Sequence, residues 1–120
     1  MKITIEDRER YSIVRPEGNI VRENQGELRA YVDDLLERKS RGIALDFGLV
    51  DYMDSAGLGC CVGIHKLMCE KRYGTLVLLR PSLNVGVLWR MIRLDLIIPM
   101  FDDEEEAVEL LNQGPRPLAP

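Results

Sequence analysis

Residues 43–79 read IALDFGLVDYMDSAGLGCCVGIHKLMCEKRYGTLVLL, and this stretch decides the fold. It begins and ends with short apolar runs, residues 43–47 and 75–79, which we predict to be buried strands. Between them, residues 56–72 carry apolar side chains at helical spacing and end before Gly74, a common helix stop. A strand, a helix and a second strand in succession are typical of parallel pairing with a right-handed crossover.

The remaining elements are predicted from the same two periodicities, alternation for strands and three- to four-residue steps for helices. We predict strands at 2–6 and 10–16, a helix at 24–39, a helix at 82–92, a brief strand at 97–98 and a last helix from Asp102. The first two strands form a hairpin, which adds an antiparallel pair to the sheet. The order therefore predicts an α/β fold: a mixed β-sheet of four to five strands with α-helices packed mainly on one face.

The length of 120 residues suits one domain. Residues 114–120 hold three prolines and one glycine, a composition that disfavours a packed structure. We therefore predict a single domain at 1–113 and a disordered tail at 114–120.

Composition and local sequence pattern argue against several classes of function. The formal net charge is −4, and no stripe of basic residues indicates nucleic-acid binding. The N-terminus has no signal-peptide core, and no segment has the roughly 18 apolar residues of a membrane helix, so we expect a cytoplasmic protein. The three cysteines, Cys60, Cys61 and Cys69, have neither the spacing of a disulfide framework nor that of a metal site. We expect no metal, no cofactor and no catalytic site.

The loop that joins the strand at 43–47 to the helix at 56–72 carries the most chemistry. In open α/β sheets, functional loops gather at the carboxyl ends of strands. Ser55 is expected at the first turn of the helix, where free N–H groups and the helix dipole favour an anion such as a phosphate. The alternative is that Asp54 or Ser55 is simply the helix N-cap.

Residues 52–59, YMDSAGLG, resemble the signature loop of STAS domains, specifically that of bacterial anti-sigma factor antagonists. The family pattern is an apolar residue, Asp, Ser, then Ser, Thr or Ala, then Gly-Leu-Gly. The resemblance extends over nearly the whole chain through the order of its elements, and residues 88–91, LWRM, resemble the family's third helix. It implies a STAS-like sheet with the helices mainly on one face.

The resemblance also implies a phosphorylation-switched cycle. The unmodified antagonist binds an anti-sigma factor that is also a serine kinase, the kinase phosphorylates the serine that matches Ser55, and a serine phosphatase resets the cycle. The antagonist catalyses nothing and contacts neither nucleic acid nor membrane. On this reading the partner-binding residues are Met53, Asp54, Ser55, Gly57 and Leu58.

Two positions depart from the family pattern. Val21 lies near the place where the family often has an aspartate on its partner face, and Arg93-Leu94 replaces a Gly-Leu pair after the third helix. The identity of the partner is therefore open. Arg80, Arg90 and Arg93 could form a local basic rim, and an ordinary solvated surface is the alternative.

Three other functions are alternatives to that of an anti-sigma factor antagonist. A constitutive STAS scaffold or ligand-binding module of a signalling or transport complex agrees with the same fold. A receiver-like domain phosphorylated on Asp46 agrees with the length but needs a helix where residues 10–16 alternate as a strand. A serine hydrolase needs a base beside Ser55, whereas the only histidine, His65, is roughly 15 Å along the same helix.

Overall fold

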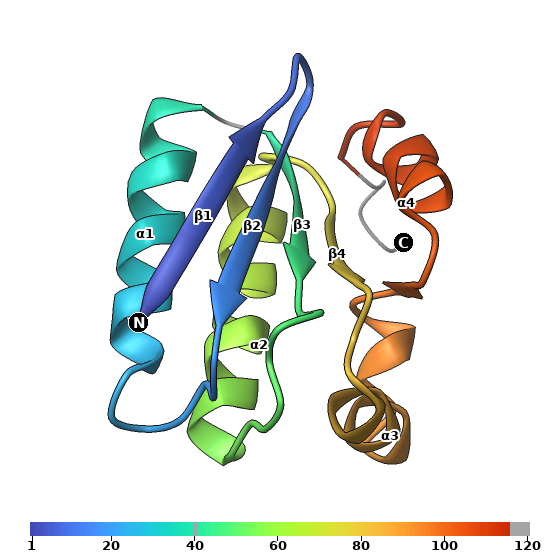
Figure 1. Ribbon diagram of the computed structural model, residues 1–120. Coiled ribbons are helices and arrows are strands. Elements are labelled where there is room, and N and C mark those ends of the chain that lie inside the picture. The colour runs from blue at the N-terminus through green and yellow to red at the C-terminus, as the bar shows by residue number, and fades with distance from the viewer. Residues whose placement is uncertain (40, 116–120) are drawn as a thin grey trace.

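The computed structural model describes residues 1–39 and 41–115, in which five strands form one sheet in chain order (Figure 1). The strands are β1 (Lys2–Asp7), β2 (Tyr11–Glu17), β3 (Gly42–Asp46), β4 (Leu76–Leu79) and β5 (Met100–Phe101). β1 pairs antiparallel with β2, and all other neighbours are parallel. The predicted mixed α/β fold is therefore confirmed. Of the predicted tail at 114–120, residues 116–120 lie outside the described residues.

Helices cover the sheet unequally. They are α1 (Gln25–Arg38), α2 (Ser55–Lys71), α3 (Leu83–Met91) and α4 (Glu104–Leu111), with a single 3₁₀ turn, η1, at Leu94–Leu96. α1 and α2 run side by side behind the sheet in Figure 1, whereas α4 lies against β3, β4 and β5 on the opposite face. No helix among the described residues has both the length and the apolar character needed to span a bilayer.

Alternation along the strands produces two hydrophobic cores. Ile43 and Leu45 of β3 belong to the larger core, which α1 and α2 complete, whereas Ala44 between them belongs to the smaller core with Ala107 and Leu111 of α4. Successive side chains of a strand point to opposite faces, so a strand that is apolar at every position must be covered on both sides. This requirement explains why the chain crosses to the second face after β5, where α4 begins.

The brief strand predicted at 97–98 is wrong. Ile97 and Ile98 follow the turn η1, and the last strand begins at Met100. Ile98 instead fills the larger core, and its carbonyl oxygen accepts a hydrogen bond from the Trp89 indole N–H at 3.0 Å. Because that carbonyl is already bonded to a side chain, sheet pairing starts one residue later, where the carbonyl of Pro99 accepts from the N–H of Leu78 at 2.9 Å.

The final helix begins two residues later than predicted. The carboxylate of Asp103 accepts a hydrogen bond from the backbone N–H of Glu105, so Asp103 is the N-cap and Glu104 the first helical residue. Acidic residues then occupy the first turn, where the helix dipole favours them.

Replacing Leu111 by alanine tests whether α4 is a stabilising part of the domain. Leu111 is 2% exposed in the smaller core, so the Leu111→Ala variant should lose about 2–5 kcal/mol of unfolding free energy. Urea unfolding measures the loss. Glu109→Ala, an exposed change on the same helix, should alter stability by no more than about 0.5 kcal/mol. Equal stability of the two variants would show that α4 does not contribute to the folded core.

Candidate functional site

Ser55 lies at an exposed corner of the molecule. β3 ends at Asp46, and the chain then runs through a loop to Ser55, the first residue of α2. The side chain of Ser55 is exposed, and no hydrogen bond joins its hydroxyl to another residue in the described part of the chain. The sequence placed this serine correctly at a strand-to-helix junction on the carboxyl side of a central parallel strand.

Asp54, and not Ser55, is the N-cap of α2. One carboxylate oxygen, Oδ1, accepts from the backbone N–H of Gly57 at 2.9 Å, and the other, Oδ2, accepts from the N–H of Arg22 at 3.0 Å. The hydrogen bonds from Gly57 and then Arg22 lower the pKa of the Asp54 carboxyl below its ordinary value, because they favour the charged form. Asp54 therefore ties the start of α2 to the loop that follows β2 and leaves the Ser55 hydroxyl unused by the fold.

The two loops are joined along their backbones as well. Ile20 forms an isolated parallel bridge with Met53, and the N–H of Ile20 donates to the carbonyl of Tyr52 at 3.0 Å. Gly57 then passes so close to this bridge that an added Cβ would lie 2.3 Å from the carbonyl oxygen of Ile20. Only glycine fits at this position, so the Gly57 of the sequence motif is a packing requirement.

Burial separates the predicted partner-binding residues into two groups. Met53 is 2% exposed and belongs to the larger core, and Gly57 is also buried, so both lie beneath the loop surface. Asp54 and Leu58 are half-buried, and Ser55 is exposed. In this conformation the side chain of Met53 cannot contact a partner, and its place in the predicted site is that of a support.

Sequence reasoning missed two exposed apolar side chains of the same loop. Leu49 is 60% exposed and Tyr52 is 54% exposed. A large apolar residue in a loop between two buried elements is itself a signal of an interaction surface, because nothing in the fold requires it to be there.

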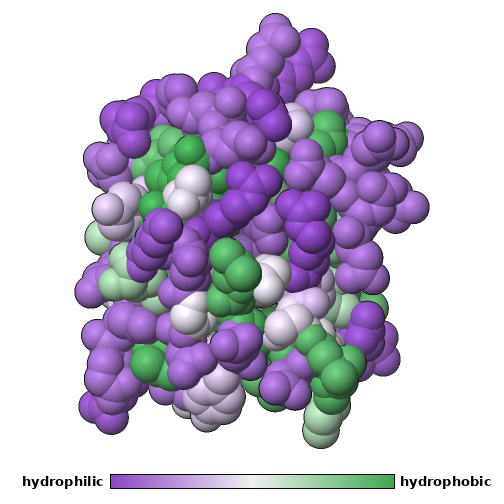
Figure 2. All heavy atoms as spheres, viewed as in Figure 1, coloured by the Kyte–Doolittle hydropathy of each residue, from purple (hydrophilic) through white to green (hydrophobic). Residues whose placement is uncertain are grey.

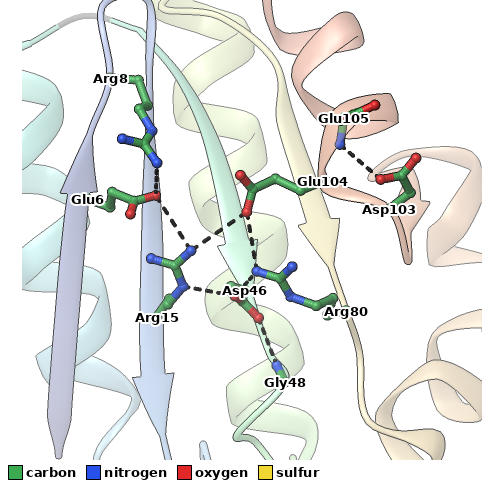
Figure 3. A network of polar contacts seen from close by, with 9 residues as sticks. All are labelled: Glu6, Arg8, Arg15, Asp46, Gly48, Arg80, Asp103, Glu104 and Glu105. Atoms are coloured by element: carbon green, nitrogen blue, oxygen red, sulfur yellow. Dashed lines mark hydrogen bonds and ion pairs between the residues drawn. The ribbon is translucent and has the colours of Figure 1, made fainter.

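Asp46, the last residue of β3, is the centre of a polar network at the root of this loop (Figure 3). It is 7% exposed, and its Oδ2 atom accepts hydrogen bonds from Arg80 at 2.8 Å and from Arg15 at 3.0 Å. Its Oδ1 atom accepts from the N–H of Gly48 at 3.0 Å, which starts the loop. Burial acts to raise the pKa of the Asp46 carboxyl, but the bonds from Arg80, Gly48 and Arg15 outweigh it and lower the pKa below its ordinary value.

The network also fastens α4 to the sheet. The carboxylate of Glu104 approaches Arg80 at 3.3 Å and Arg15 at 3.7 Å, so both arginines lie between an acid of β3 and an acid of α4. On the other side, Glu6 of β1 pairs with Arg8 at 3.0 Å and with Arg15 at 3.5 Å. Figure 3 shows these charges alternating in sign across the open face of the sheet. Such compensation lets a charged residue end a strand that is otherwise apolar.

The receiver alternative is wrong. A receiver has the strand order 2-1-3-4-5 in an all-parallel sheet, whereas this sheet has the order 1-2-3-4-5 with an antiparallel first pair. Asp46 is also enclosed by two arginines rather than by further carboxylates. The hydrolase alternative meets the obstacle anticipated from the sequence, since His65 lies further along α2, with its Nε2 atom 3.6 Å from the Sγ atom of Cys69.

Comparisons with known proteins agree with this fold. The family model described as STAS domain matches residues 2–107. A protein of Paenibacillus polymyxa named anti-sigma F factor antagonist is 28% identical over 113 residues, which cover 93% of this chain and 96% of that protein.

Two solved structures share the fold. A Thermotoga maritima protein described as a candidate anti-sigma factor antagonist superposes with a TM-score of 0.84 at 25% identity, covering 92% of this chain and 94% of that one. The anti-sigma factor antagonist SpoIIAA in its unphosphorylated form superposes with a TM-score of 0.76 at 22% identity, covering 93% of this chain and 97% of that one.

The two glycines of the motif, one buried and one exposed, provide a matched test of the loop geometry. Gly57→Ala should destabilise the protein by about 1–3 kcal/mol, because the new methyl group forces apart the backbones of α2 and the Ile20 loop. Gly59→Ala, with nothing within 4 Å of the new Cβ, should stabilise the helix by about 0.5–1 kcal/mol. Urea unfolding gives both values, and the amide NMR shifts of Ile20 and Asp54 should move only in the first variant. Two equally stable variants would contradict the close approach.

The Asp46 network predicts a particular acid response. Because the folded-state pKa of Asp46 is lowered from its ordinary value of 3.8, its ionised form contributes stability that is fully present above that value. This contribution is lost as the pH falls through the folded-state pKa. Asp46→Asn should therefore lower stability at neutral pH and flatten the loss of stability below about pH 4. Urea unfolding at a series of pH values measures both effects.

Asp34→Asn is the control for this experiment, since Asp34 is an exposed acid that pairs with Arg38 on the surface of α1. It should retain the acid response of the wild type. If Asp46→Asn also retained it, the network would not be a source of the pH dependence.

Proposed function

The chain belongs to the STAS domain family, and from that premise we propose that it is an anti-sigma factor antagonist. It binds an anti-sigma factor through the surface around Ser55 while that serine is unmodified, and it releases the partner when Ser55 is phosphorylated. The observation that supports this proposal best is the exposed Ser55 hydroxyl at the start of α2, which the fold does not use. The Paenibacillus polymyxa relative, by its name, points to the same role.

Because Asp54 and not Ser55 caps α2, Ser55 is a suitable acceptor of a phosphoryl group. A serine that caps its own helix would have to break a structural hydrogen bond before its hydroxyl could reach a kinase. Here Asp54 caps α2 through the N–H of Gly57, so the Ser55 hydroxyl can react without loss of the cap.

A phosphate on Ser55 changes the surface more than it changes the fold. It adds about −1.5 to −2 charges at neutral pH at the N-terminus of α2, where the helix dipole offsets part of the cost. The neighbouring loop already carries the carboxylates of Asp51 and Asp54. The unmodified loop therefore presents a neutral hydroxyl between Tyr52 and Leu58, and the modified loop presents a concentrated negative charge that opposes docking.

The proposed partners are an anti-sigma factor with serine kinase activity, which both binds and phosphorylates the loop, and a serine phosphatase that reverses the reaction. The antagonist in this scheme accepts a phosphoryl group and performs no chemistry of its own. The proposed location is the cytoplasm, where such a partner would control a sigma factor.

The test begins with the protein isolated from its own cells under several growth conditions. Intact mass followed by mapping of the peptides that cover residues 43–66 should find one phosphate, on Ser55. The anti-sigma factor that co-purifies is then expressed and titrated with the wild type and with Ser55→Ala and Ser55→Asp. The alanine variant should bind and resist phosphorylation, whereas the aspartate variant should lose binding by at least about tenfold because of its added charge.

Gln113→Asp places the same charge at an exposed position after α4 and should bind as the wild type does. Equal binding by a folded Ser55→Asp variant would contradict the switch. A chain that binds the partner but is never modified would favour the constitutive STAS module, with the same docking surface and no phosphate cycle.

A further inference from the structure

Helix α3 is apolar on the side that faces solvent. Leu83, Val87 and Met91 recur at four-residue steps and are 81%, 44% and 75% exposed. Residues four apart lie on one face of a helix, so the three side chains form a stripe. The opposite side of the same helix is also apolar, with Val85 and Trp89 buried in the larger core. Packing within the domain therefore explains only half of the apolar character of α3.

Three more exposed apolar residues follow α3 in the chain. Ile92, Leu96 and Ile97 are 51%, 67% and 46% exposed. Figure 2 shows hydrophobic residues gathered over α3 at the lower right of the view, with polar residues around them. We call the six residues Leu83, Val87, Met91, Ile92, Leu96 and Ile97 the α3 surface. A contiguous apolar area bordered by polar residues is typical of a binding site.

Helix α3 lies beside the loop that carries Ser55. A cleft of about 190 Å³ lies between them, and its walls come from both elements: Tyr52 and Met53 on one side, Asn84, Val85 and Leu88 on the other. Tyr52, which is 54% exposed, lines the loop side of this cleft. On the other side Asn84 and Leu88 directly follow Leu83 and Val87 in the helix, so the α3 surface borders the cleft. A protein that docks on Ser55 and extends across this cleft reaches α3 next.

The charges around the α3 surface indicate what covers it. Residues 83–97 contain two arginines, Arg90 and Arg93, and one aspartate, Asp95, although the whole chain has a net charge of −4. Arg93 pairs with Asp95 at 3.5 Å, whereas the side chain of Arg90 forms no hydrogen bond or ion pair with another described residue. An apolar surface with an unpaired arginine at its border complements an apolar surface bordered by carboxylates.

We propose that the α3 surface is a second half of the docking site and binds an apolar, carboxylate-bordered patch on the same partner that contacts the Ser55 loop. This inference rests on the proposed function, since the partner is the anti-sigma factor. The α3 half supplies affinity through apolar contact that phosphorylation of Ser55 leaves chemically unchanged, and the Ser55 half supplies the switch.

Two other molecules could cover the α3 surface: a second copy of the chain, or an anionic bilayer. A second copy docked on α3 would bring a second Arg90 and a second Arg93 into the same interface, which adds like charge and supplies no carboxylate-bordered patch. An anionic bilayer would complement the arginines, but α3 has nine residues, fewer than three turns, and offers a short anchor. Both occupants are included as outcomes of the test.

The test measures binding between the full chain and the anti-sigma factor that co-purifies with it. Leu83→Gln with Met91→Gln removes apolar area at two exposed positions without changing charge, and should raise Kd about tenfold or more while the urea midpoint stays that of the wild type. Tyr31→Gln is the matched control, because Tyr31 is 51% exposed on α1, away from this surface, and should leave Kd unchanged.

A charge pair completes the design. Arg90→Glu should weaken binding severalfold, with the difference from wild type shrinking at high salt, whereas Lys66→Glu on the exposed side of α2 should have no effect. Ser55→Asp is titrated alongside. If Ser55→Asp loses binding while the Leu83/Met91 and Arg90 variants bind as wild type, the α3 inference is wrong and the proposed function stands. If Ser55→Asp also binds as wild type, the proposed function itself is wrong.

Two further measurements test whether a second copy of the chain or a lipid membrane binds the α3 surface instead of the anti-sigma factor. Sedimentation of the free chain should give a monomer, and flotation with vesicles of phosphatidylglycerol and phosphatidylcholine should leave it in solution. A dimer or vesicle binding that the Leu83/Met91 change abolishes would overturn the assignment of this surface to the anti-sigma factor.

Discussion

The need to cover β3 on both faces is the constraint from which the rest of the structure follows. Ile43, Ala44 and Leu45 are all buried, and alternate side chains of a strand cannot share one face. One face is closed by α1 and α2, and the other is closed only when the chain passes β4 and places α4 against the sheet. Asp46 ends the strand with a charge, and Arg15 and Arg80 compensate it where α4 begins. The loop that presents Ser55 therefore starts from a fixed point.

The surface loop is rigidly supported from below. Asp54 holds the start of α2 to the loop after β2, and Gly57 allows the two backbones to approach closely. Met53 anchors the loop in the core with 2% of its side chain exposed. A rigid loop loses little conformational entropy when a partner binds. The favourable free energy of contact with its few exposed side chains is therefore not cancelled by the entropic cost of ordering the loop.

Periodicity in the sequence was enough to predict the central elements. Residues 43–47 and 75–79 are strands within one residue, and the helix predicted at 56–72 runs from Ser55 to Lys71. The strand predicted at 97–98 was wrong because Ile98 fills the core: the bond from Trp89 to the Ile98 carbonyl depends on tertiary packing and has no local signature. The sequence also could not predict which residues of α3 are buried and which are exposed, since Trp89 and Met91 are two positions apart and both are apolar.

The site was only partly predictable for a related physical reason. A motif states which residue types recur, and Met53, Gly57 and Ser55 all recur, but only Ser55 points outward. The close approach that makes Gly57 necessary involves Ile20, a residue far away in the sequence and outside the motif. Leu49 lies outside the motif, and Tyr52 precedes the first residue that the family pattern specifies, so only their exposed fractions above one half mark them as surface residues.

A switch that works by charge has to be combined with a contact that does not depend on charge. Apolar contact gives affinity roughly in proportion to the area removed from water, and it is insensitive to a phosphate placed beyond it. A single serine, in contrast, contributes little area, but its modification adds about −1.5 to −2 charges that a partner must desolvate. Tyr52 lines the cleft that α3 shares with the loop. Under the proposed function, such an arrangement would let affinity be adjusted at Leu83 and Met91 by changes in apolar area, while a response to phosphorylation would be adjusted separately around Ser55.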